Sequence, residues 1–106
     1  MQNASLQAFM ESIPDAFLPE KAGDLEASIV LDLGDEAWSL LIKDGACRLQ
    51  EGDLHNADVR LQASEKDLLR LFKGELNPMF AFTTRKLRLK GDVNLAMRLI
   101  QYFDLV

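Results

Sequence analysis

Histidine, cysteine and tryptophan each occur only once in this chain of 106 residues. A transition-metal site needs several imidazole or thiolate ligands, so His55 and Cys47 alone do not provide one, and a single cysteine forms no internal disulfide. The sequence also lacks the Gly-x-x-x-x-Gly-Lys and Gly-x-Gly-x-x-Gly patterns of phosphate and dinucleotide sites. We therefore expect neither a metal nor a cofactor.

Long apolar runs are absent too. No stretch approaches the ~20 apolar residues that a membrane span requires, and residues 1–5 lack the charged-then-apolar layout of a secretory signal. The hydrophobic content of 48% suits one core with room for one cavity. We expect a single domain over residues 1–106, located in the cytoplasm.

Few side chains could carry out catalysis. His55 lies in a polar loop beside Asp53, where a solvated histidine is the ordinary interpretation. Cys47 shares a strand face with Leu49, where a small buried hydrophobic residue is expected. The neighbouring carboxylates at residues 35–36 fall in a turn, not in the arrangement of a glycosidase pair. The sequence predicts no catalytic residue, and we do not expect an enzyme.

Charge is distributed unevenly along the chain. The net charge is −5, but residues 1–69 hold five basic and fourteen acidic residues, whereas residues 70–106 hold seven basic and three acidic ones. A nucleic-acid binder is usually basic overall, so we expect no nucleic-acid partner. Two interpretations of the basic cluster stay open: a solvated strand face, or transient contact with an anionic membrane or a ligand carboxylate through Arg85, Lys86, Arg88 and Lys90.

Hydrophobic periodicity predicts the elements of the N-terminal half. Apolar residues from Leu6 to Ile13 follow helical spacing, and Pro14 should stop or redirect that helix. A short helical turn near Pro19 is expected next. From residue 26 the period changes to two, which predicts three antiparallel strands, the last two joined by a hairpin at residues 44–45.

The C-terminal half carries clear start and stop signals. Alternation over residues 59–63 predicts a fourth strand. Ser64 is a typical N-cap residue for a helix that Gly74 closes, and Asn77-Pro78 begins a short helical segment. A fifth, basic strand covers residues 86–90, and Asp92 caps a last helix that reaches Phe103.

These elements predict an α+β domain: a mainly antiparallel five-stranded sheet with helices packed on one face. The chain near the third and last helices holds more bulky apolar residues than two short helices need to cover such a sheet. Core packing and a ligand pocket both explain this surplus, and periodicity does not separate them. The surplus comprises Leu69, Phe72, Leu76, Met79, Phe80, Phe82, Leu95, Met97 and Leu99.

Three motifs in the second half of the chain resemble one family. They are Ala57-Asp58-Val59, the Gly-Glu-Leu-Asn-Pro-Met-Phe-Ala-Phe run at 74–82, and Lys-Leu-Arg-Leu-Lys-Gly-Asp at 86–92. Together they resemble the sterol carrier protein two, or nonspecific lipid-transfer, family; the N-terminal half matches only in its order of elements. The resemblance implies a carrier of apolar ligands, not a catalyst, with an apolar tunnel between sheet and helices.

The resemblance also implies which elements line the tunnel: the inner face of the sheet, the helix before Gly74 and the last helix. Relatives often have a polar glutamine where this chain has Met97, which favours a fatty-acyl or isoprenoid ligand over a sterol; phospholipid is a further ligand class. A second hypothesis is an accessory module that presents lipid intermediates to a partner enzyme. We expect ligand contacts from Ile29, Leu31, Trp38, Leu40, Leu69, Phe72, Leu76, Met79, Phe80, Phe82, Met97 and Phe103.

Overall fold

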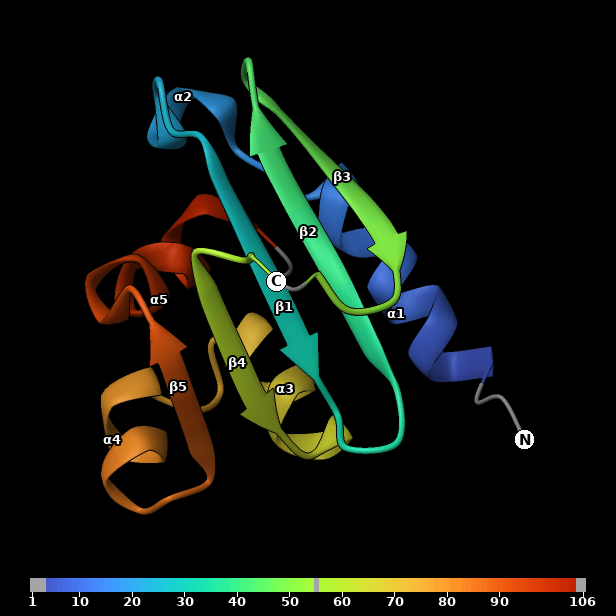
Figure 1. Ribbon diagram of the computed structural model, residues 1–106, viewed down its shortest axis with the longest axis vertical. Coiled ribbons are helices and arrows are strands. Elements are labelled where there is room, and N and C mark those ends of the chain that lie inside the picture. The colour runs from blue at the N-terminus through green and yellow to red at the C-terminus, as the bar shows by residue number, and fades with distance from the viewer. Residues whose placement is uncertain (1–3, 55, 105–106) are drawn as a thin grey trace.

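A five-stranded mixed sheet forms the centre of the protein in the computed structural model, which describes residues 4–54 and 56–104 (Figure 1). The strand order is β3-β2-β1-β4-β5. In chain order the elements are α1 (Ala4–Asp15), α2 (Pro19–Ala22), β1 (Ala27–Asp32), β2 (Ala37–Lys43), β3 (Ala46–Glu51), β4 (Val59–Ala63), α3 (Glu65–Phe72), α4 (Pro78–Thr83), β5 (Leu87–Gly91), α5 (Val93–Leu99) and the 3-10 turn η1 (Ile100–Tyr102).

Strand pairing is antiparallel except at the centre, where β1 and β4 run parallel. The β2–β3 hairpin has the sharp turn that the sequence predicts, because Asp44 and Gly45 both adopt left-handed backbone angles, with φ of 54° and 73°. This turn sets the register that places Leu40 opposite Leu49 and Trp38 opposite Glu51. The predicted α+β class and mainly antiparallel sheet are confirmed.

The helices pack on one face of the sheet, behind the strands in the view of Figure 1, with α4 beside the edge strand β5. The strand residues that alternate toward the helices are buried, including Ile29, Leu31 and Leu40, each with no exposed surface. Met10 and Ile13 from α1 and Leu99 from α5 are equally buried against them. No helix in the described part of the chain is both long enough and apolar enough to cross a membrane.

The opposite face of the sheet is partly covered as well, which simple alternation does not anticipate. The described residues between β3 and β4 cross in front of β2 and β1 (Figure 1), and on this face of the sheet Val30 and Ser39 are fully buried. The Ser39 hydroxyl donates to the carbonyl of Gly52 at 2.8 Å. Val30 does alternate away from the helices as expected, but it too has no exposed surface.

Gly91 explains the Lys-Gly-Asp motif. Its φ is 100°, and a Cβ atom at this position would lie 2.2 Å from the carbonyl oxygen of Asp58. That carbonyl instead accepts a hydrogen bond from the amide of Asp92 at 2.9 Å, and the Asp92 carboxylate accepts from the amide of Leu95 at 3.0 Å. A glycine is therefore required where the edge strand turns into the last helix.

Two helix boundaries differ slightly from the sequence predictions. Pro14 lies inside the last turn of α1, which ends one residue later at Asp15. The final α-helix ends at Leu99 and continues only as the turn η1, after which Phe103 becomes extended and forms an isolated bridge with Phe17. This bridge brings the C-terminal segment back to the residues that follow α1.

Candidate functional site

An apolar layer lies between the sheet and the helices, and Phe72 is at its centre. The Phe72 ring meets Phe9 of α1 with 6.2 Å between centroids and Phe103 with 5.7 Å, both in edge-to-face geometry. Phe103 in turn lies 5.6 Å from Phe17. Rings from α1, α3 and the C-terminal segment therefore meet over the same region of the sheet, and such pairs are favourable beyond their burial.

The twelve predicted ligand-contacting residues fall into three groups by burial. Leu69 and Met97 are half-buried, and Met79, Phe80 and Phe82 are exposed on α4. The structure thus brings seven residues together and leaves three of the α4 side chains at the surface. The seven buried ones, all in one cluster, are Ile29, Leu31, Trp38, Leu40, Phe72, Leu76 and Phe103.

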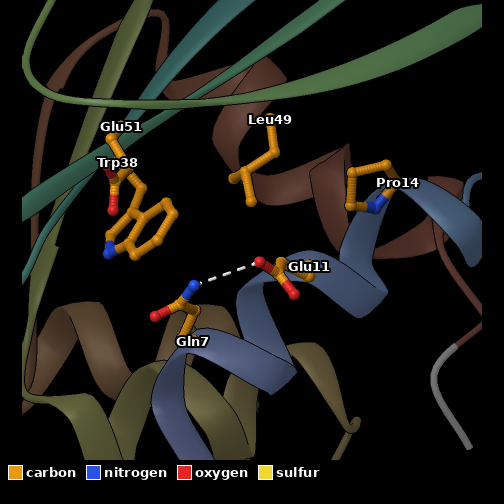
Figure 2. Close-up of a pocket in the computed structure, with 6 residues that line it drawn as sticks. All are labelled: Gln7, Glu11, Pro14, Trp38, Leu49 and Glu51. Atoms are coloured by element: carbon orange, nitrogen blue, oxygen red, sulfur yellow. Dashed lines mark hydrogen bonds between the residues drawn. The ribbon is translucent and has the colours of Figure 1, made fainter. Parts of the chain in front are cut away.

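A groove with a volume of about 480 Å³ opens beside this layer, between α1 and the strands β2 and β3 (Figure 2). Trp38 and Leu49 give it an apolar wall, and Pro14 closes the α1 side. Gln7, Glu11 and Glu51 add polar groups around it; the Gln7 side-chain amide donates to Glu11 at 3.2 Å. Trp38 belongs both to the wall of this groove and to the buried cluster, so the groove borders the apolar layer.

Sequence reasoning identified only Trp38 among these six groove residues. The hairpin register could have added two more, since Leu49 and Glu51 lie directly opposite Leu40 and Trp38. Nothing local in the sequence indicates that α1 docks over β2 and β3, so its own residues could not have been assigned to the groove.

A second groove, of about 510 Å³, lies at the opposite edge of the sheet, where α4 meets the edge strand β5. Its character differs, because it combines one aromatic side chain with cationic ones. Its lining residues are Gln62, Phe82, Arg85, Leu87, Arg88, Leu89 and Lys90.

Ionisable groups in the described residues offer little for catalysis or metal binding. No three histidine, cysteine or carboxylate side chains of this part of the chain come together as metal ligands, and His55 lies outside it. Cys47 is half-buried on β3, and burial raises the pKa of its thiol to about 11. At neutral pH this thiol stays protonated, so it is a weak nucleophile.

Arg60 illustrates a cation that the protein neutralises. It lies on the sheet face away from the helices and contacts Asp53 and Asp32, the latter at 2.9 Å. The hydrogen bond to Asp53 and the nearby charges of both carboxylates raise the pKa of Arg60. Its charge is therefore satisfied within the domain.

Comparison with known proteins identifies the class of this domain. The model of the SCP-2 sterol transfer family matches residues 6–104, so the chain belongs to that family. A curated relative is sterol carrier protein 2 from Bos taurus, which is 36% identical over 67 residues; the match covers 62% of this chain and 12% of that protein. This chain therefore corresponds to a small part of the relative's length.

Solved structures share the fold. The sec-alkylsulfatase Pisa1 from Pseudomonas sp. superposes with a TM-score of 0.84 at 17% identity, over 92% of this chain and 16% of that one. Palmitated SCP2L2 from Aedes aegypti superposes with a TM-score of 0.70 at 20% identity, over 95% of this chain and 93% of that one. The same fold thus occurs both as a nearly whole chain and as one part of a large enzyme.

Proposed function

We propose that this domain binds a single apolar lipid chain, fatty-acyl or isoprenoid, in the layer between the sheet and the helices. The observation that carries the proposal is the apolar layer around Phe72 in a chain of the SCP-2 sterol transfer family. The palmitated state of the Aedes aegypti protein supports the ligand class. We assign the domain no reaction of its own.

The polarity of the interior favours a plain hydrocarbon chain. Ser39 is the only polar residue among the buried side chains of the described residues, and its hydroxyl already donates to Gly52 on the far face of the sheet. The layer therefore has no spare hydrogen-bonding side chain for a sterol hydroxyl. Met97, half-buried on α5, adds an adaptable thioether rather than an amide.

Burial alone supplies enough free energy for useful affinity. Each methylene removed from water contributes ~0.8 kcal/mol, so a tail of about ten carbons contributes roughly 8 kcal/mol before ordering costs are subtracted. We propose that the lipid chain enters through the groove beneath α1, where Trp38 and Leu49 extend the apolar surface outward. Affinity from burial without directional bonds also makes the domain tolerant of chain length.

The test uses fluorescent fatty acid binding to Met97→Trp, with Val93→Trp as the matched control. Both changes add an indole to α5, but Met97 is half-buried whereas Val93 is 44% exposed. We expect Met97→Trp to change the affinity severalfold while Val93→Trp leaves it at the wild-type value. Equal affinities in two folded variants would show that the ligand does not lie against α5, and Phe72→Trp then repeats the test on α3.

A second candidate function is an accessory module that presents a lipid to a partner enzyme. The superposition on 16% of the Pisa1 chain favours it, because there the fold is part of an enzyme. Affinity purification of the tagged chain from its native cells distinguishes the two functions. Stoichiometric recovery of one enzyme supports the module, whereas recovery of lipid without an enzyme supports a carrier that acts alone.

A further inference from the structure

Helix α4 presents an unusual apolar surface to water. Met79 is 57% exposed, Phe80 55% and Phe82 41%, although the helix has only six residues. Ala81 is the one residue of α4 that is buried, so the large side chains on the other sides of the helix point outward. Single exposed apolar residues are ordinary, but three on two turns form a patch.

This surface is held in place by a well-capped helix. The Asn77 side chain accepts hydrogen bonds from the amides of Met79 at 2.8 Å and Phe80 at 3.2 Å. At the other end the amide of Lys86 donates to the carbonyl of Ala81 at 2.8 Å. Both ends are therefore satisfied, and the exposed rings belong to a defined helix and not to a frayed end.

The helix ends on an arginine in a conformation that favours glycine. Arg85 has a φ of 65°, and it occupies the same position after α4 that Gly74, with a φ of 76°, occupies after α3. A side chain in the left-handed region costs about 1–2 kcal/mol relative to the right-handed one. The chain thus keeps a cationic side chain at this point despite a conformational cost.

Cations continue from Arg85 along the edge strand. Phe82, Arg85, Arg88 and Lys90 line one groove, so the aromatic patch and the basic side chains are adjacent. Within the described residues, no hydrogen bond or ion pair occupies the side chains of Arg85, Arg88 or Lys90, in contrast to Arg60 with its two carboxylate partners. This positive face is exceptional on a chain whose net charge is −5.

We propose that this surface docks the domain on a bilayer that contains anionic phospholipid. We name it the α4–β5 face, and it comprises Met79, Phe80, Phe82, Arg85, Arg88 and Lys90. Apolar and aromatic side chains on a short helix enter the boundary between headgroups and acyl chains, while adjacent basic side chains contact the lipid phosphates. The proposal does not depend on cargo, because docking uses outward-facing residues only.

Two other occupants fit this face less well. A symmetric contact between two copies through this face would set Arg88 and Lys90 of one copy against the same residues of the other. Nucleic acid and an anionic bilayer both offer phosphates to the basic side chains, but only the bilayer also offers an apolar layer to the exposed side chains of Met79 and Phe80.

The test is co-sedimentation of the full chain with vesicles of phosphatidylcholine alone and of phosphatidylcholine mixed with phosphatidylglycerol. We expect binding only to the mixed vesicles, weakened by added salt. Each of Arg88→Gln and Lys90→Gln should lower the affinity about fivefold, and Phe80→Ala about tenfold. Matched controls elsewhere, Arg48→Gln on β3 and Val93→Ala on α5, should leave binding unchanged.

Arg85→Gly separates a docking role from a structural one. It removes a charge and relieves the left-handed conformation, so we expect thermal stability to hold or rise while vesicle affinity falls about fivefold. Equal binding to both vesicle types, or equal loss in Arg88→Gln and Arg48→Gln, would overturn the proposal. Absence of vesicle binding together with RNA binding or dimer formation through Phe80 would overturn it as well. None of these outcomes affects the fatty acid test with Met97→Trp.

Discussion

Helices α3 and α4 follow one another in the chain and are built with the same devices, yet one serves the interior and the other the surface. Ser64 caps α3 by accepting from the amide of Asp67 at 3.1 Å, and Asn77 caps α4 in the same way. Phe72 of α3 is 2% exposed, whereas Phe80 of α4 is 55% exposed. Signals that start and stop a helix therefore carry no information about which helix is covered.

The C-terminal ends of the two helices sharpen the contrast. After α3 the amide of Glu75 donates to the carbonyl of Arg70 at 2.8 Å. After α4 the amide of Lys86 donates to the carbonyl of Ala81, also at 2.8 Å. The hydrogen bonding is equivalent, but the left-handed residue is Gly74 in the first case and Arg85 in the second. Gly74 and Arg85 are both exposed, so packing against the domain does not account for the difference; we interpret Arg85 as kept for its charge at the α4–β5 face.

The largest expected effect compares one phenylalanine in each helix. Phe72→Ala should lower the free energy of unfolding by about 3–5 kcal/mol, because it removes a ring from the centre of the apolar layer. Phe80→Ala should change it by less than about 0.5 kcal/mol, as is usual for exposed sites. Urea unfolding of both variants measures the difference, and similar losses would show that α4 is covered in solution.

A smaller effect compares the two left-handed residues. Gly74→Ala should destabilise the fold by about 1–2 kcal/mol through the backbone alone, since no atom lies within 4 Å of the added Cβ. Arg85→Gly should do the opposite and stabilise the fold by roughly 0.5 kcal/mol. Glycine relieves the strain of the left-handed conformation, but part of this gain is lost because glycine gives the unfolded chain more conformational freedom. Thermal unfolding monitored by circular dichroism tests both signs, and destabilisation by Arg85→Gly would mean that the side chain supports the fold.

The smallest effect compares the two caps. Ser64→Ala and Asn77→Ala should each cost about 1 kcal/mol, because each leaves amide donors of a helix start unsatisfied. Their consequences for docking should differ: only Asn77→Ala should weaken binding to anionic vesicles, since only its helix carries the exposed rings. Equal vesicle binding by both variants would remove α4 from the docking surface.

Local chemistry explains what could be predicted from the sequence. The turn at Asp44-Gly45, the caps at Ser64 and Asn77 and the alternation in the strands each depend on a few neighbouring residues, and all appear where expected. The parallel β1–β4 pairing, the hydrogen bond from Ser39 to Gly52 and the position of α1 over β2 and β3 depend on contacts between distant segments. No local signal specifies them.

The candidate site shows the same limit at the level of single residues. Phe72, Phe80 and Phe82 are the same residue type within eleven positions, and the family resemblance led us to expect all three as ligand contacts. Only Phe72 is buried, because α3 lies behind the sheet in Figure 1, whereas α4 lies beside the edge strand β5. The pattern of apolar residues did not indicate that Phe72 is buried while Phe80 and Phe82 are exposed.

Native mass spectrometry of the freshly purified chain, followed by organic extraction, tests the central claim most directly. A carrier of one lipid chain should show a population heavier than the protein by one fatty acid or isoprenoid, and dissociation should release that molecule intact. Protein that is empty on purification and also takes up no added palmitate would contradict the account.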